Sequence, residues 1–71
     1  MEIDHDREAN AAYLRLGKTP IKAGAAVYQS DIISSPVNDG QVILDFDAEG
    51  RLIGIELLCV DQLVAPEVLH P

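Results

Sequence analysis

The chain has 71 residues, 48% of them hydrophobic, and its 12 acidic and 5 basic residues give a formal net charge of −7. This length supports a single domain, residues 1–71, and one cysteine excludes an internal disulfide. Because binding to nucleic acid depends on Lys and Arg neutralising phosphates, the acidic balance excludes a nucleic-acid partner, and no apolar run approaches the roughly 20 residues of a membrane span.

The same numbers predict self-association. A chain this short buries about 60% of its extended surface and needs a disulfide, a metal or a partner subunit for stability. With no Cys/His cluster for zinc, association remains, as a homodimer or higher oligomer or with an unidentified protein partner. The acidic start, Met1–Asp6, lacks the features of a signal peptide, and with the lone cysteine it predicts a cytoplasmic protein. We predict no cofactor.

The first third of the chain predicts two strands. Residues 2–5 form a short strand with Ile3 inward, and residues 6–10 form a polar turn. Residues 11–16 alternate, with Ala12, Leu14 and Leu16 on one face. A helix over residues 8–16 is the alternative, since Ala, Leu and Arg favour helices. We favour the strand, because Gly17 ends the run early and the alternation is regular.

The middle of the chain predicts an edge strand. A turn over residues 17–20 and a connection over residues 21–24 precede a strand over residues 25–35. Neither face of that strand is clearly apolar, which is typical of a sheet edge or an oligomer contact. A loop over residues 36–40 follows, with Asn38-Asp39-Gly40 as turn residues.

The strongest pattern is a β-hairpin centred on residues 42–57. Matching its apolar residues predicts the pairs Phe46–Ile53, Leu44–Ile55 and Val42–Leu57, because directly opposed side chains share a face. This register leaves an even-numbered loop, Glu49-Gly50 or Ala48–Arg51. We favour the four-residue loop with Gly50 at positive φ, because Glu is a poor first residue of a type I′ turn.

The end of the chain predicts short helical turns. Asp61 is the expected N-cap of a turn over residues 62–65, and Pro66 the first residue of another through Leu69. The predicted fold class is therefore mainly β, on the borderline of α+β: an antiparallel β-meander of four to five strands with a short C-terminal helical segment.

An acidic cluster around the turn resembles a calcium loop. Residues 45–56 fit the template D-x-D-x-[DN]-G-x5-E except for Glu49 at the fifth position. The context argues against an EF-hand, because both flanks alternate as strands and an extended Glu56 cannot fold back. A weaker divalent-cation or small-ligand site remains an alternative hypothesis, with Asp45, Asp47, Glu49 and Glu56 as its ligands.

The remaining candidate residues for acid–base, metal-binding or nucleophilic chemistry have simpler structural interpretations. Asp45 and Glu56 lie near-diagonally on one face and could act as paired carboxylates, but an exposed acidic patch is the simpler interpretation. If Glu56 is buried, it needs Arg15 or Arg51 as a partner. His5 and His70 lie far apart in sequence and are interpreted as surface histidines, and Cys59 as a small buried hydrophobe. No catalytic motif supports an enzyme.

Two stretches resemble a known family. The pattern Asp6-x-Glu8-Ala9-Asn10-Ala11-x-Tyr13-Leu14-x-Leu16 and the run from Val42 to Leu58 are similar to the small prokaryotic domain-of-unknown-function family 2283. Asn10 stands where that family usually has Asp, and Cys59-Val60 replaces a more polar strand end. The resemblance implies a small β-rich domain and no particular activity. We predict a non-enzymatic, homo-oligomeric interaction or structural module.

Overall fold

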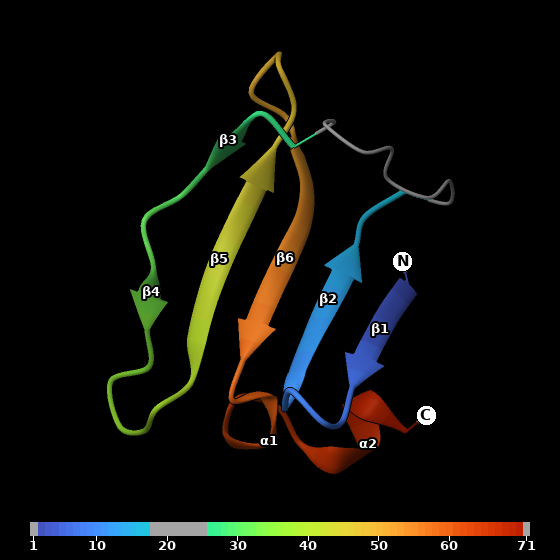
Figure 1. Ribbon diagram of the computed structural model, residues 1–71, viewed down its shortest axis with the longest axis vertical. Coiled ribbons are helices and arrows are strands. Elements are labelled where there is room, and N and C mark those ends of the chain that lie inside the picture. The colour runs from blue at the N-terminus through green and yellow to red at the C-terminus, as the bar shows by residue number, and fades with distance from the viewer. Residues whose placement is uncertain (1, 18–25, 71) are drawn as a thin grey trace.

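The described residues form six strands and two short helices. The structure, a computed structural model, describes residues 2–17 and 26–70. In chain order the elements are β1 (Glu2–Asp6), β2 (Ala11–Arg15), β3 (Tyr28–Gln29), β4 (Ile33–Ser34), β5 (Gln41–Phe46), β6 (Leu52–Leu58), α1 (Val60–Leu63) and α2 (Pro66–Leu69) (Figure 1). The predicted connection over residues 21–24, most of the turn before it and the first residue of the predicted strand over 25–35 lie outside the described residues.

All strands belong to one antiparallel sheet, with the order β1-β2-β6-β5-β3 and with β4 also paired to β5. The prediction of a mainly β fold with a short helical end is confirmed. The strand order differs from a simple meander, because β6 lies between β2 and β5 rather than at an edge. The most apolar strand thereby obtains a hydrogen-bonded neighbour on both sides. Among the described residues, no helix is long and apolar enough to cross a membrane.

The central hairpin confirms two of the three predicted pairs. Val42 faces Leu57 and Leu44 faces Ile55. Phe46, however, faces Leu52, because the register shifts by one residue between Asp45 and Phe46 and leaves Ile53 as the extra residue of a bulge. The prediction that Phe46 faces Ile53 is therefore wrong.

The turn of this hairpin explains the shift. The Asp47 N–H donates to the Arg51 carbonyl at 2.9 Å, and the Gly50 N–H donates to the Asp47 carbonyl at 3.0 Å. Three residues, Ala48 to Gly50, therefore close the loop, and the predicted even-numbered loop is wrong. Gly50 has φ 79°, as predicted. A three-residue loop of this type ends in a glycine of left-handed conformation.

The predicted long strand over residues 25–35 is an edge strand, but it is divided in two. Tyr28 pairs with Phe46, whereas Ile33 pairs with Val42, so the edge gains one residue relative to β5 between β3 and β4. Before this bulge the Ser30 N–H donates to the Leu44 carbonyl, and the Leu44 N–H donates back to Ser30 Oγ. The bulge interrupts the row of backbone groups that an added strand would need.

The helices lie together at one end of the sheet (Figure 1). Pro66 begins α2, as predicted. The prediction that Asp61 caps α1 is wrong: the N-cap is Cys59, at φ 51°, and Asp61 lies in the first turn. The Val60 N–H instead donates to the Asn10 carbonyl at 3.0 Å, which fixes α1 against the β1–β2 turn. Cys59 is half-buried, so its assignment as a buried hydrophobe is also wrong.

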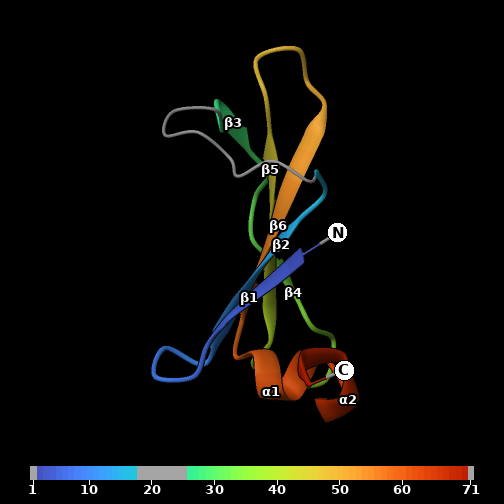
Figure 2. The same ribbon diagram turned by 90° about the vertical axis from the view of Figure 1, so that its right-hand side faces the viewer.

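The sheet is a single layer over most of its length. Seen edge-on in Figure 2, it has helices beside it at one end and no described segment over the rest of either face. Of the described apolar residues, Ala12 and Val60 are the buried ones, with 4% and 0% exposure. For a chain that is 48% hydrophobic this is a very small core.

Strand pairing sorts the side chains onto two faces, since paired residues point the same way. The register rows of what we call the apolar face contain Ile3, Leu14, Leu44 and Ile55, and then His5, Ala12, Ile33, Val42 and Leu57. The rows of what we call the acidic face contain Glu2, Arg15, Gln29, Asp45 and Gly54, then Asp4, Tyr13, Ile43 and Glu56, and then Asp6, Ala11, Ser34, Gln41 and Leu58.

Candidate functional site

The acidic face holds a buried carboxylate, Asp45. It lies on β5, is 6% exposed, and is held from two sides. The Tyr13 hydroxyl donates to Asp45 Oδ2 at 2.8 Å, and Gln29 Nε2 donates to Asp45 Oδ1 at 2.9 Å. The network thus joins strands β2, β5 and β3 across the sheet. Each carboxylate oxygen of Asp45 has a partner, which is what a buried charge requires.

A glycine on the intervening strand makes this contact possible. Gly54 lies on β6 between Arg15 and Asp45 in the register, and the Tyr13 ring crosses over it. A Cβ atom added to Gly54 would overlap the Tyr13 ring and hydroxyl. Gly54 is therefore required by the close approach of the ring, a common reason for glycine inside a strand. The sequence signal is the isolated Gly54 in an apolar run, which sequence analysis left unexplained.

The environment of Tyr13 keeps its hydroxyl protonated. Burial, the hydrogen bond to Asp45 and the charges of Asp45 and Glu56 raise the pKa of Tyr13 from 10.0 to about 12. A tyrosine in this state donates a hydrogen bond at neutral pH and does not act as a general base. The network therefore holds strands β2, β5 and β3 in position.

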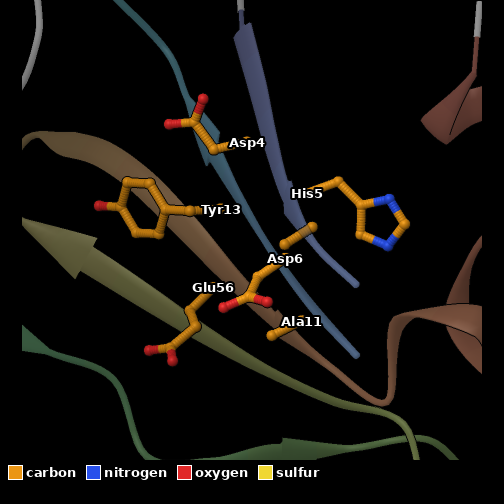
Figure 3. A pocket seen from close by; sticks show the side chains of 7 residues that line it. Asp4, His5, Asp6, Ala11, Tyr13 and Glu56 are labelled. Carbon is orange, nitrogen blue, oxygen red and sulfur yellow. The ribbon is translucent and has the colours of Figure 1, made fainter. Parts of the chain in front are cut away.

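Glu56, Asp4 and Asp6 of this face line a shallow cavity. Figure 3 shows Asp4, Tyr13, Asp6 and Glu56 projecting to one side of the sheet and His5 to the other. The cavity measures about 280 Å³, and Ala11 and Ala12 also line it. Glu56 is half-buried and faces Tyr13 and Ile43 in the register.

The arginines proposed for Glu56 pair elsewhere. Arg15 Nη2 lies 3.3 Å from Asp4 Oδ2 and also pairs with Glu2, whereas Arg51 lies in the turn. Among the described residues, neither guanidinium forms an ion pair with Glu56. The buried carboxylate is thus Asp45 rather than Glu56. Its hydrogen-bond donors, Tyr13 and Gln29, are uncharged.

The carboxylates of the acidic turn, Asp47 and Glu49, have hydrogen-bond and ion-pair partners within the turn itself. Asp47 Oδ1 accepts from the N–H groups of Glu49 and Arg51, both at 2.9 Å, and Asp47 Oδ2 accepts from Arg51 Nε at 3.0 Å. Arg51 Nη2 also pairs with Glu49 Oε2. These bonds, led by the Arg51 N–H, hold the pKa of Asp47 below its ordinary value of 3.8.

The predicted cation ligands are therefore divided among three settings. Asp47 and Glu49 share Arg51, Asp45 is bound to Tyr13 and Gln29, and Glu56 faces the cavity. Within residues 2–17 and 26–70, no group of three or more His, Cys, Asp or Glu side chains is arranged to hold a metal ion. Cation binding by these four carboxylates stays a prediction.

A second cavity brings together residues from opposite ends of the chain. It measures about 380 Å³ and lies between the β1–β2 hairpin and the helices, lined by His5, Arg7, Asn10, Asp61, Val64, Pro66, Leu69 and His70. The imidazole centroids of His5 and His70 are 5.8 Å apart, with the ring planes at 57°. The two histidines, which lie far apart in the sequence, are therefore neighbours in the structure, contrary to their interpretation as separate surface residues. No local pattern signals this contact, because 65 positions in the sequence separate the two residues.

These features define a small single-sheet antiparallel β protein with one acidic face and one apolar face. The chain belongs to the DUF2283 family, described as a protein of unknown function, whose family model matches residues 2–60. The matched region contains all six strands and ends at the first residue of α1. The resemblance inferred from the sequence is confirmed. Comparisons with curated proteins and with solved structures gave no match.

Proposed function

We propose that the protein is a non-enzymatic interaction module that assembles with a second copy of itself through its apolar face. The observation that carries this proposal is the lack of a core: Ala12 and Val60 are the buried apolar residues of the described chain. Leu14, Leu44, Ile55 and the other apolar-face side chains lie in rows that no described segment covers above the helices. Burying that surface supplies the stability that a small single-layer sheet lacks.

The charge distribution favours a second copy as the occupant. Of the nine residues in the rows of the apolar face, eight are uncharged hydrocarbons and the ninth is His5. Two such faces can pack without burying a charge, as in a two-fold symmetric sandwich of sheets about 10 Å apart. The acidic faces, which carry Glu2, Asp4, Asp6 and Glu56, then point away from each other.

The sheet edges are poorly suited to assembly. Two β1 edges in antiparallel contact would bring Glu2, Asp4 and Asp6 of one copy against those of another, and opposed like charges are destabilising. The bulge between β3 and β4 interrupts the other edge. The apolar face is left as the assembly surface.

Adjacent residues of β5 give a matched test. Leu44 lies on the apolar face and Ile43 on the acidic face, and both are half-buried. We expect the wild-type protein to sediment as a dimer at micromolar concentration. Leu44→Lys should sediment as a monomer, because it places a charge in the interface, whereas Ile43→Lys should stay dimeric.

A peripheral variant covers the case in which Leu44→Lys fails to fold. Ile3 lies on the edge strand and is 37% exposed, so Ile3→Lys should fold, as judged by far-UV circular dichroism, and weaken the dimer. A wild-type chain that stays monomeric at tens of micromolar, a range in which ordinary dimers persist, would overturn the proposal. So would an Ile43→Lys variant that dissociates as fully as Leu44→Lys.

A further inference from the structure

We propose that His5 and His70 form a two-histidine site for a borderline transition-metal ion, such as Zn²⁺, Ni²⁺ or Cu²⁺. Both imidazoles line the 380 Å³ cavity between the β1–β2 hairpin and the helices. Imidazole nitrogen is a preferred ligand of these ions, whereas Ca²⁺ and Mg²⁺ prefer oxygen. The site is thus distinct in chemistry from the predicted cation site of Asp45, Asp47, Glu49 and Glu56, and it contains none of those four residues.

The spacing of the rings suits a shared ion. With metal–nitrogen bonds of about 2.0–2.1 Å, two imidazoles on one ion have centroids roughly 5 Å apart at a tetrahedral angle and about 6.5 Å apart when opposed. The observed centroid distance of 5.8 Å lies between these limits. Within residues 2–17 and 26–70, neither imidazole takes part in the hydrogen bonds of the cavity, which join Asn10 to Asp61. Their lone pairs are therefore available to a ligand.

The surroundings of the pair determine what else the ion would meet. Asp61 and Arg7 line the same cavity, and Asp61 Oδ1 accepts from Asn10 Nδ2 at 2.7 Å. The described residues provide no third side chain already in ligand position. Two protein nitrogens with water in the other positions are therefore the expected ligands. The apolar residues Val64, Pro66 and Leu69 form the rest of the wall.

The fold holds one ligand more firmly than the other. His5 is half-buried on β1, paired opposite Ala12 in the sheet. His70 is exposed at the end of α2, with its N–H donating to the Pro66 carbonyl at 3.1 Å. A four-residue helix has little stability of its own. An ion bound to both rings would therefore fasten α2 to β1 and raise the stability of the whole chain.

The test is a titration of the full chain, with any affinity tag removed, with zinc sulfate, nickel chloride or copper chloride. Calorimetry should show one ion bound per chain, and the melting temperature should rise. His5→Gln and His70→Gln should each weaken binding by about tenfold or more and abolish the thermal shift. Cys59→Ser and Asp47→Asn should bind like the wild type, because the thiol and the acidic turn are the competing sites.

A second measurement needs no variant. In nitrogen-15 spectra of the wild-type chain, substoichiometric Cu²⁺ should broaden the resonances of His5 and His70 before those of Asp47 or Cys59. The proposal is overturned if none of the three ions gives heat or a thermal shift. It is equally overturned if binding survives in both histidine variants or is lost in Cys59→Ser. The sedimentation of the wild type and of Leu44→Lys tests the dimer separately from these metal titrations.

Discussion

The two faces of the sheet differ in how their side chains are stabilised. On the acidic face, the chain satisfies its own polar groups, because Tyr13 and Gln29 donate to the two oxygens of Asp45. On the apolar face, leucine, isoleucine and valine residues share register rows, and away from the helices no described segment lies over these strands (Figure 2). A single-layer sheet can complete a hydrogen-bond network across its surface, but it cannot bury a flat apolar surface alone. The acidic face is thus stabilised by hydrogen bonds within the chain, whereas we propose that a second copy covers the apolar face.

The largest effect on the acidic face is expected from Gly54→Ala. The new methyl group would displace the Tyr13 ring and break its hydrogen bond to Asp45. Overpacking and a lost bond to a carboxylate together predict a loss of about 3 kcal/mol in the free energy of unfolding. Urea denaturation followed by circular dichroism measures this loss.

Gly17 is the matched control for this substitution. An added Cβ at Gly17 meets no atom within 4 Å, so Gly17→Ala should leave the stability nearly unchanged. In a double-mutant cycle, Tyr13→Ala should remove most of the further cost of Gly54→Ala, because the clash requires the ring. Additive effects would show that Gly54 serves another purpose.

A smaller effect is expected from Tyr13→Phe, which keeps the ring and removes the hydroxyl. One lost hydrogen bond to a carboxylate predicts about 1.5 kcal/mol of destabilisation at neutral pH. The pKa of Tyr13 is about 12 in the folded chain against an ordinary 10.0, so the folded state binds this proton more tightly. The stabilisation is complete below pH 10 and is lost as the pH rises through 12.

The wild type and Tyr13→Phe should therefore converge in stability above pH 10. Absorbance titration provides the direct measurement: the wild type should show a tyrosinate increase near pH 12 that is missing from Tyr13→Phe. Identical titration curves for the two proteins would contradict the assigned pKa. Convergence of the two proteins at low pH instead would point to a different cause.

The smallest effect is expected in the turn, where Asp47→Ala removes the acceptor for the N–H groups of Glu49 and Arg51. Because the pKa of Asp47 is lowered below 3.8, its stabilisation is present at neutral pH and is lost as the pH falls through the folded pKa. The melting temperature of Asp47→Ala should lie slightly below that of the wild type at pH 7. The difference should vanish in acid, whereas a constant difference would exclude the carboxylate charge as its source.

The same variant tests the hypothesis of a cation site at the turn. Millimolar calcium that stabilises the wild type more than Asp47→Ala would support it. We expect equal responses, because the Arg51 guanidinium already lies against Asp47 and Glu49. An ion at these carboxylates would have to displace that cation.

Local sequence patterns predicted much of the fold. The alternation of residues 11–16 favours a strand over a helix, and the structure confirms a strand over Ala11–Arg15, in which residues two apart share a face. The pairs Val42–Leu57 and Leu44–Ile55 followed from matching apolar sets across a turn, and the conformation of Gly50 from its place in that turn. Each of these features depends on residues close together in the sequence.

The features that depend on residues far apart in the sequence were decided by the tertiary structure. A one-residue bulge at Ile53 changed the partner of Phe46, because the geometry of the turn outweighed the matching of side chains there. The burial of Asp45 depends on Tyr13, 32 positions away, and the approach of His5 to His70 joins residues still further apart. Sequence by itself determined which faces of the strands are apolar and where the chain turns. The order of the strands and the contacts across them required the assembled sheet, because their energy comes from pairings that no local pattern encodes.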